Sequence, residues 1–428
     1  MYKDGIGLVI LDYTKAIEYF NRALELGNND VVFNLGVLYQ NGFGVERDFI
    51  RARRYYERAL ELGNNNALIN IGLLYQNGFG VERDFIRARE YYERALELGN
   101  NDALVNIGLL YQNGLGVERD FIRTREYYER ALELGNTDAL VNIGLLYKNG
   151  LGVERDIVRA RECFVRASEL GNTDAIVNLG ILYECGTGVE IDYVRAREYY
   201  EKASTLGNSR AINNVGSLYQ YGLGVRQDYN TAKKYYEKAA KLGSSIAISN
   251  IGWLYRKGFG VAQNYEKARE YYEKAANLNN TDAINNIGWL YHDGFGVKQD
   301  YNKAIEYFKI AEKLGDADAI NNIGWFYYNG FGVNKSNTEA IKYYEQAIKL
   351  GNINAINNIG LLYKNGGADL GQEKYIIAKE YFEEAAKFGN KYSLYNLGLL
   401  YRDGLGVMQD RDRAREYFER AAKSGYTG

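Results

Sequence analysis

The chain has 428 residues, of which 46% are hydrophobic and 25% charged, and it contains no proline. Its 53 Lys and Arg nearly balance its 55 Asp and Glu, so the bulk charge gives no reason to expect nucleic acid or an anionic membrane as a partner. The apolar content excludes a disordered chain, and the absence of proline fits a protein of helices and short turns.

A short motif, Asn-Ile/Leu/Val-Gly-x-x-Tyr in most copies, recurs along the chain. Its glycine stands at Gly36, Gly72, Gly108, Gly144, Gly180, Gly216, Gly252, Gly288, Gly324 and Gly360, with one more copy around Gly398 after two inserted residues. A fixed period of this size indicates a solenoid, in which each unit buries its apolar face against its neighbours. We expect one all-α solenoid over residues 1–428: a leading half repeat at 1–29, nine full repeats at 30–351, and two C-terminal repeats at 352–428, with a two-residue loop insertion and a more polar last hairpin.

The chain begins within a repeat. The stretch Gly5–Leu11 is apolar but too short for a signal peptide or a membrane span, and it aligns with the inter-helix loop of later repeats. We therefore expect a helix over residues 13–26 that is frayed or covered by a partner. With no signal peptide or transmembrane segment visible, we expect a cytoplasmic protein without membrane insertion, unless the gene begins upstream of Met1.

Residues 65–99 illustrate the first helix of a repeat. Ala67, Ile71 and Tyr75 follow one another at helical spacing. Gly72 lies in the interior of this helix, where glycine costs about 1 kcal/mol relative to alanine. Its recurrence in every copy predicts a close approach of two helices that a Cβ atom would block.

The second helix of the repeat follows a glycine-containing turn. Asp84 stands at the N-cap position before Phe85–Leu98, and Gly99 stands just after the helix. We expect the buried stripe of this helix to consist of Ala88, Tyr92, Ala95 and Leu98. Most tyrosines recur at fixed positions of the repeat, so we expect them to belong to the core.

The pattern from Ala67 through Gly72, Gly78-x-Gly80 and Asp84 to Gly99 resembles the Sel-1-like repeat, a relative of the tetratricopeptide repeat. The resemblance covers essentially the whole chain. It implies a right-handed α/α superhelix whose first helices line the concave face. It also implies a scaffold or adaptor, since members of the family act in membrane-protein quality control, signalling and host–microbe contacts.

Each repeat carries an asparagine two residues before the motif glycine. In the second half of the chain these residues are Asn214, Asn250, Asn286, Asn322, Asn358 and Asn396. An amide both donates and accepts, which suits hydrogen bonds to a neighbouring repeat or the clamping of an extended peptide. Tetratricopeptide domains use such asparagines in the second way, and both interpretations remain open.

A second set of equivalent positions lies three residues further along the first helix. All three tryptophans of the chain, Trp253, Trp289 and Trp325, stand here in successive repeats. We expect them to lie beside the asparagines on one helix face. Rigid aromatics framed by amides are typical of a peptide-binding groove, although tryptophan could instead fill a wider gap between first helices.

Catalytic and cofactor motifs are weak. The Gly-x-Gly of each loop follows a helix and lacks a third glycine, so it is no dinucleotide or phosphate loop. The single histidine, His292, falls in a variable set of positions that we expect to be surface. We expect Cys163 and Cys185 to be free thiols, and we expect no metal, cofactor or small-molecule substrate.

The sequence therefore predicts a non-enzymatic scaffold that binds a protein or peptide segment in a groove lined by first helices, and no nucleic acid. The expected contact residues are Asn214, Asn250, Trp253, Asn286, Trp289, Asn322, Trp325 and Asn358. One alternative is a lumenal or periplasmic adaptor in quality control or host interaction. The other is a hydrolase of unknown chemistry, which would depend on His292 or a pair of acids in the groove.

Overall fold

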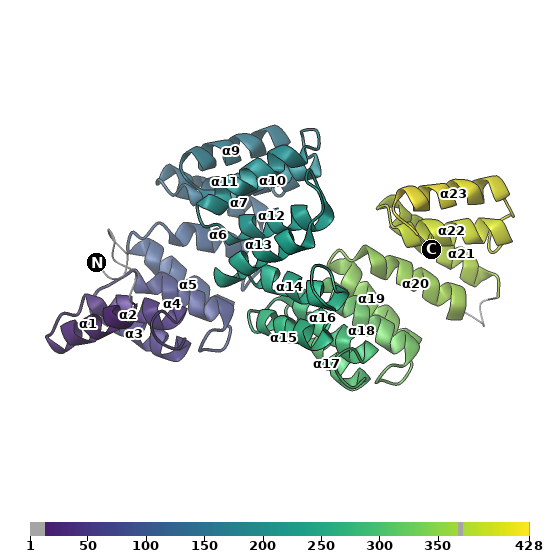
Figure 1. Cartoon of the computed structure of the whole chain (residues 1–428). Coiled ribbons are helices and arrows are strands. Elements are labelled where there is room, and N and C mark those ends of the chain that lie inside the picture. Colours follow the sequence, from purple (N-terminus) through teal and green to yellow (C-terminus); the bar gives the residue numbers. More distant parts are fainter. Residues whose placement is uncertain (1–12, 367–370, 428) are drawn as a thin grey trace. The chain divides into compact units, whose positions relative to one another are not determined.

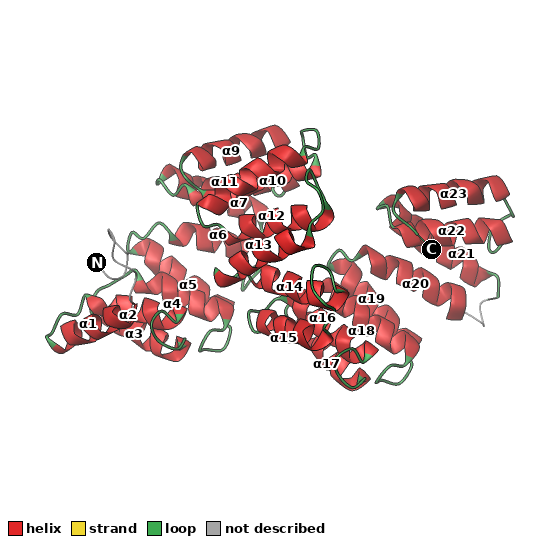
Figure 2. Cartoon of the chain, viewed as in Figure 1, coloured by secondary structure: helices red, strands yellow, loops and turns green. Residues whose placement is uncertain are grey.

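The computed structural model describes residues 13–366 and 371–427, and in these ranges every regular element is an α-helix (Figures 1 and 2). The chain divides into two compact units, Met1–Asn208 and Ser209–Gly428, each a series of helical hairpins. The prediction of an all-α solenoid of hairpins is confirmed, while its division into a leading half, nine and two repeats stays a prediction. The apolar stretch Gly5–Leu11 lies outside the described residues.

Helices with even numbers are the first helices of the repeats, and those with odd numbers are the second. The first unit contains α1 (Tyr13–Glu25), α2 (Val31–Asn41), α3 (Phe49–Glu61), α4 (Ala67–Asn77), α5 (Phe85–Glu97), α6 (Ala103–Asn113), α7 (Phe121–Glu133), α8 (Asp138–Asn149), α9 (Ile157–Glu169), α10 (Thr173–Cys185) and α11 (Tyr193–Thr205). The second contains α12 (Ser209–Tyr221), α13 (Tyr229–Lys241), α14 (Ser245–Lys257), α15 (Tyr265–Ala276), α16 (Thr281–Asp293), α17 (Tyr301–Lys313), α18 (Ala317–Asn329), α19 (Asn337–Lys349), α20 (Ile353–Gly366), α21 (Glu373–Lys387), α22 (Lys391–Asp403) and α23 (Arg411–Lys423).

Side-chain caps and left-handed residues delimit the helices as the sequence predicts. The carboxylate of Asp84 accepts hydrogen bonds from the backbone N–H groups of Ile86 and Arg87, both at 3.0 Å, and so begins α5. After α15, Asn279 takes the place of the usual glycine with a φ of 58°. Asparagine tolerates this left-handed conformation better than other non-glycine residues do.

The motif glycine lies where the two helices of a hairpin touch. A Cβ atom built on Gly72 would lie 2.5 Å from Cε1 of Tyr92 on α5, and equivalent contacts recur at the other motif glycines. The predicted close approach of the two helices is confirmed.

The core of each hairpin lies between its two helices and the next repeat. Ala88, Tyr92 and Ala95 are fully buried, as expected, but Leu98 is 50% exposed, so its assignment to the buried stripe was wrong. The reason is that α5 already ends at Glu97 and Leu98 caps it with a non-helical backbone, which turns its side chain away from the stripe.

Buried tyrosines place their hydroxyl groups on the first helix of the same hairpin. The hydroxyl of Tyr92 donates to Oε1 of Gln76 at 2.9 Å, and that of Tyr236 donates to Gln220 at 2.8 Å. A large side chain is thereby buried without an unsatisfied polar atom. Among the described residues, no helix is both long enough and apolar enough to cross a bilayer.

Candidate functional site: a polar and aromatic groove in the second unit

The second unit contains an open hollow of about 450 Å³ along its first helices. Residues of α12, α14, α16, α18 and α20 line it, and these helices follow one another along the stack (Figure 1). The residues that line it are Gln220, Tyr221, Ile246, Ser249, Asn250, Trp253, Asp282, Asn285, Asn286, Trp289, Asp318, Asn321, Asn322 and Asn354. We call this surface the groove.

Two of the three tryptophans line the groove. Trp253 and Trp289 are half-buried and stand on α14 and α16 beside the asparagine amides. Trp325 does not line it: its ring lies 5.6 Å from that of Trp289 and 5.1 Å from that of Phe331. Two indoles therefore line the groove, and Trp325 packs against one of them, Trp289, within an aromatic cluster.

The predicted asparagines differ in whether they line the groove, and some of those that line it also bond to a neighbouring repeat. Asn250, Asn286 and Asn322 line the groove, whereas Asn214 and Asn358 do not. Nδ2 of Asn250 donates to Oδ1 of Asn213 in the preceding repeat at 2.9 Å, and Nδ2 of Asn358 donates to Asn321 at 2.8 Å.

These bonds use only part of each amide. Nδ2 of Asn322 reaches Oδ1 of Asn285 at 3.5 Å, and Oδ1 of Asn286 accepts from Arg256 at 3.1 Å. Among the described residues, Oδ1 of Asn250 and Oδ1 of Asn322 have no side-chain or backbone partner. The asparagines thus join neighbouring repeats and still present acceptors at the groove, so their two proposed roles are compatible.

The sequence prediction missed the acidic residues of the groove. Asp282 and Asp318 lie in the first turns of α16 and α18, four residues before Asn286 and Asn322, and therefore on the same helix face. The Asp282 side chain is exposed, but partial loss of water around its carboxylate in the groove raises its pKa, and the nearby carboxylates of Asp316 and Asp318 raise it further. That four-residue spacing from a predicted groove residue was the available signal.

His292 is not a surface residue, contrary to the prediction. Its side chain is only 16% exposed, and the rings of Trp289, Trp325 and Phe331 lie 5.1, 5.4 and 5.3 Å from it. The sequence position varies between repeats, but in this repeat the neighbouring tryptophans of α16 and α18 cover it. The aromatic cluster includes His292 as one of its rings.

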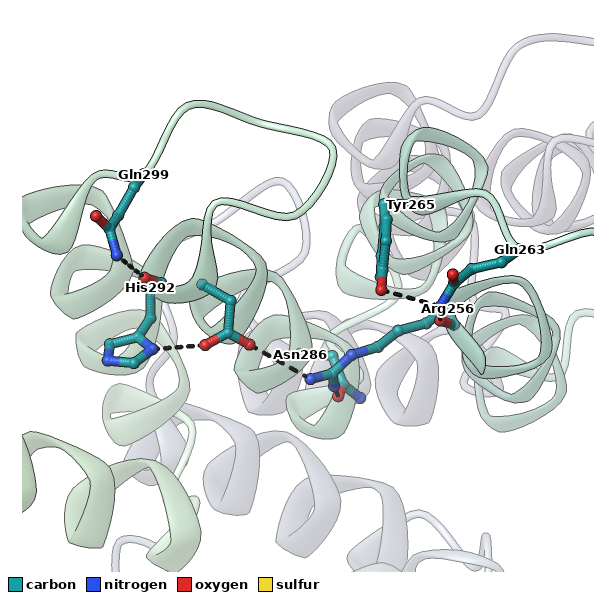
Figure 3. A network of polar contacts seen from close by, with 7 residues as sticks. Arg256, Gln263, Tyr265, Asn286, His292 and Gln299 are labelled. Carbon is teal, nitrogen blue, oxygen red and sulfur yellow. Dashed lines mark hydrogen bonds and ion pairs between the residues drawn. The ribbon is translucent and has the colours of Figure 1, made fainter. Parts of the chain in front are cut away.

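A chain of polar contacts runs from His292 to the preceding repeat (Figure 3). Nδ1 of His292 lies 2.8 Å from Oδ1 of Asp293, and the other oxygen of Asp293 lies 3.7 Å from Arg256. Arg256 also donates to Asn286, so the network ends at the groove wall. Nε2 of His292 is buried and has no partner among the described residues.

Arg256 also changes the surroundings of Tyr272. It occupies the position of Gln220, which accepts the tyrosine hydroxyl in the preceding repeat. Among the described residues no group meets the buried hydroxyl of Tyr272 in good hydrogen-bond geometry, although the charged side chain of Arg256 interacts with it. Burial raises the pKa of Tyr272 to about 12, and Arg256 opposes that shift.

The described residues contain no group of three or more His, Cys, Asp or Glu side chains placed to hold a metal ion. Cys163 is half-buried and Cys185 is exposed, and both are free, as expected. Burial raises the pKa of the Cys163 thiol.

A family model described as Sel1 repeat matches almost the whole chain. The matched residues are 1–28, 31–64, 65–100, 101–136, 137–172, 173–208, 209–244, 245–280, 281–316, 317–352, 353–390 and 391–426. Among curated proteins, none matches the chain.

Solved structures of repeat proteins also match. A protective antigen of uropathogenic Escherichia coli strains displaying an SLR fold is 30% identical, with 95% of this chain and 86% of that chain covered and a TM-score of 0.45. A Sel1 repeat protein from Oxalobacter formigenes is 33% identical over 58% of this chain and 99% of that one, with a TM-score of 0.48. Yeast Tom70 is 18% identical, with 94% of this chain and 93% of that chain covered and a TM-score of 0.44. Because the family model accounts for nearly every residue from 1 to 426, the chain belongs to the Sel1 repeat family.

Proposed function

We propose that this protein is a non-enzymatic interaction scaffold that binds an extended peptide or protein segment in the groove of its second unit. Sel1 repeat solenoids are typical of protein–protein interaction scaffolds. The observation that carries the proposal is the presence of two half-buried indoles and several amide acceptors on one open surface.

The chemistry of the groove matches what a peptide requires. An extended backbone offers N–H donors at regular intervals, and the acceptors of Asn250 and Asn322 lie on α14 and α18, the first helices on either side of α16. Trp253 and Trp289 supply rigid apolar surface, which contributes much of the binding energy in protein interfaces. The amides would orient the segment by accepting hydrogen bonds from its backbone, and the indoles would bind it by apolar contact.

Truncating Trp253 tests the proposal. Peptides are first selected from a randomised display library against the full chain, and their affinities for Trp253→Ala are then measured by fluorescence anisotropy. We expect a loss of about 2 kcal/mol or more, which is roughly a 30-fold rise in Kd. Trp253 suits the test better than Trp289, whose ring also lies 5.6 Å from the buried ring of Phe308.

The matched control is Leu109→Ala, which truncates the equivalent position of α6 outside the groove. Both variants are compared with the wild-type chain by thermal unfolding. Selected peptides that bind Trp253→Ala as tightly as the wild type would refute the groove as the binding site.

A further inference from the structure

A regular amide-to-carboxylate contact links successive repeats. The asparagine just before a first helix donates through Nδ2 to the aspartate at the N-cap or in the first turn of the preceding first helix, 34 residues earlier. Within the described residues these pairs are Asn136 to Asp102 at 2.9 Å, Asn172 to Asp138 at 2.7 Å, Asn208 to Asp174 at 2.9 Å and Asn352 to Asp318 at 2.7 Å. Each such carboxylate therefore has a built-in donor.

Among the described residues, two aspartates at this position lack the contact, Asp30 and Asp282. Asp30 still has an asparagine, Asn64, 34 positions later, whereas the repeat that follows Asp282 has none at that place. The residue 34 positions later is Asp316, a second carboxylate that cannot donate when ionised. Asp316 instead accepts from the backbone N–H of Ala319 at 2.7 Å and from Nδ2 of Asn285 at 2.8 Å. Among the described residues the carboxylate of Asp282 has no hydrogen bond and no ion pair, and this exposed side chain lines the groove.

The groove supplies no positive charge to compensate for this carboxylate. Its only charged lining residues in the described chain are Asp282 and Asp318, and no Lys or Arg lines it. An independent sign of an incomplete site is Ser249, which is only 7% exposed. Its side chain lines the groove and has no hydrogen-bond partner among the described residues.

The apolar residues beside Asp282 complete the description of a site for a long cationic side chain. Ile246 and Trp253 on α14 and Trp289 on α16 line the same hollow. Lys and Arg pack their aliphatic stems on such surfaces while the charged group reaches an acid, and an indole face attracts the cation as well. A metal ion fits less well, because the described residues form no group of three or more acidic, His or Cys ligands.

We propose that the segment bound in the groove carries a Lys or Arg side chain whose charged group pairs with Asp282 and whose stem packs against Trp253 and Trp289. This inference rests on the proposed function and adds the chemical identity of the anchoring residue. Asp318 contributes negative potential while it remains bonded to Asn352, and the partner is a basic segment rather than an acidic one.

The test uses the full chain and three pools of fluorescent peptides. The pools are identical random mixtures of uncharged residues except at one fixed central position, which is Lys, norleucine or Glu. We expect the wild type to bind the Lys pool at least about fivefold more tightly than the norleucine pool, and the Glu pool most weakly. The Lys preference should shrink as salt is raised, because added ions screen the pair.

Substitutions of Asp282 test whether its carboxylate causes the preference for the Lys pool. Asp282→Asn should abolish it, and Asp282→Lys should reverse it in favour of the Glu pool. The matched control is Asp102→Asn, which removes an equivalent carboxylate of the first unit and should leave the preference unchanged. The reversal is a gain of binding, so a variant that merely misfolds cannot produce it.

The two proposals fail in different ways. Equal binding of the Lys and norleucine pools, with both weakened by Trp253→Ala, would overturn the basic anchor and leave the groove intact. A Lys preference that survives Asp282→Asn would also overturn the anchor, because it would show diffuse attraction to the chain. Binding of every pool that is insensitive to Trp253→Ala, or no binding at all, would overturn both proposals.

Discussion

At the residue scale, single side chains decide how closely the helices of a hairpin approach. The motif glycine is the clearest case, because the ring that contacts it belongs to a residue 20 positions later in the full repeats. The helix keeps a residue of low helical propensity there, since any side chain would push the two helices apart.

Gly288→Ala tests this contact. The added Cβ would lie 2.6 Å from Cε1 of Phe308, so we expect a net destabilisation of about 1–3 kcal/mol despite the better helical propensity of alanine. Chemical denaturation measures it. In a double-mutant cycle, Phe308→Leu should remove much of the penalty, because it deletes the ring atoms that clash. Independent effects of the two substitutions would contradict the account.

Asp282 gives a second prediction at this scale. Partial loss of water around its carboxylate, together with the carboxylates of Asp316 and Asp318, raises its pKa in the folded protein above the unfolded value. The folded state therefore holds its proton more tightly, and stability falls as the pH rises through the interval between the two pKa values. We expect Asp282→Asn to have a higher Tm than the wild type at pH 7 and to lose this advantage below the ordinary Asp pKa of about 3.9.

Asp102→Asn is the matched control for stability as well. Asp102 accepts a hydrogen bond from Asn136 at 2.9 Å, so removing its charge should lower the Tm at pH 7. Thermal unfolding of both variants between about pH 3 and pH 7 measures the two effects. Shifts of the same sign in the two variants would mean that Asp282 has a donor after all.

At the scale of the element, each hairpin joins its helices through a buried ring. The usual ring is a tyrosine whose hydroxyl reaches a Gln of the first helix, as in the pair of Tyr236 and Gln220. Repeats differ in this pair, and Tyr272 keeps the hydroxyl although its partner position holds Arg256.

Phenylalanine substitutions separate the two cases. Tyr236→Phe removes a hydrogen bond and leaves Oε1 of Gln220 without its donor, so we expect a loss of about 1 kcal/mol or more. Tyr272→Phe removes a buried hydroxyl that has no hydrogen bond of good geometry and should be neutral or stabilising. Urea denaturation of the two variants under identical conditions provides the comparison. Equal losses would indicate that Arg256 serves Tyr272 as a full hydrogen-bond partner.

Element boundaries were largely predictable for the same local reasons. Asp84 at the start of α5 and Gly99 after its end follow from capping chemistry, which depends on a few neighbouring residues. Leu98 was placed wrongly because the last turn of a helix ends where the cap begins, and periodicity alone does not show that point.

At the scale of the whole molecule, each compact unit repeats one hairpin, and the proposed binding site lies where the copies differ. Of the residues expected in a binding groove, Trp253, Trp289 and three of the five asparagines line the hollow, and their contact with a partner stays a prediction. Trp325 was assigned to the groove, but it packs against Phe331 and does not line the hollow. The sequence shows which residues lie on the same helix face. It does not show which of them the next repeat covers and which remain accessible in the groove.

The sequence by itself determined the repeating hairpin, its caps, its motif glycine and its tyrosine core. These features depend on contacts within one repeat or between identical neighbours, so a periodic pattern records them directly. Only the tertiary structure decided that His292 is enclosed by aromatic rings and that Asp282 faces Asp316 instead of an amide. Both facts depend on side chains that differ between adjacent repeats and meet only when the hairpins stack.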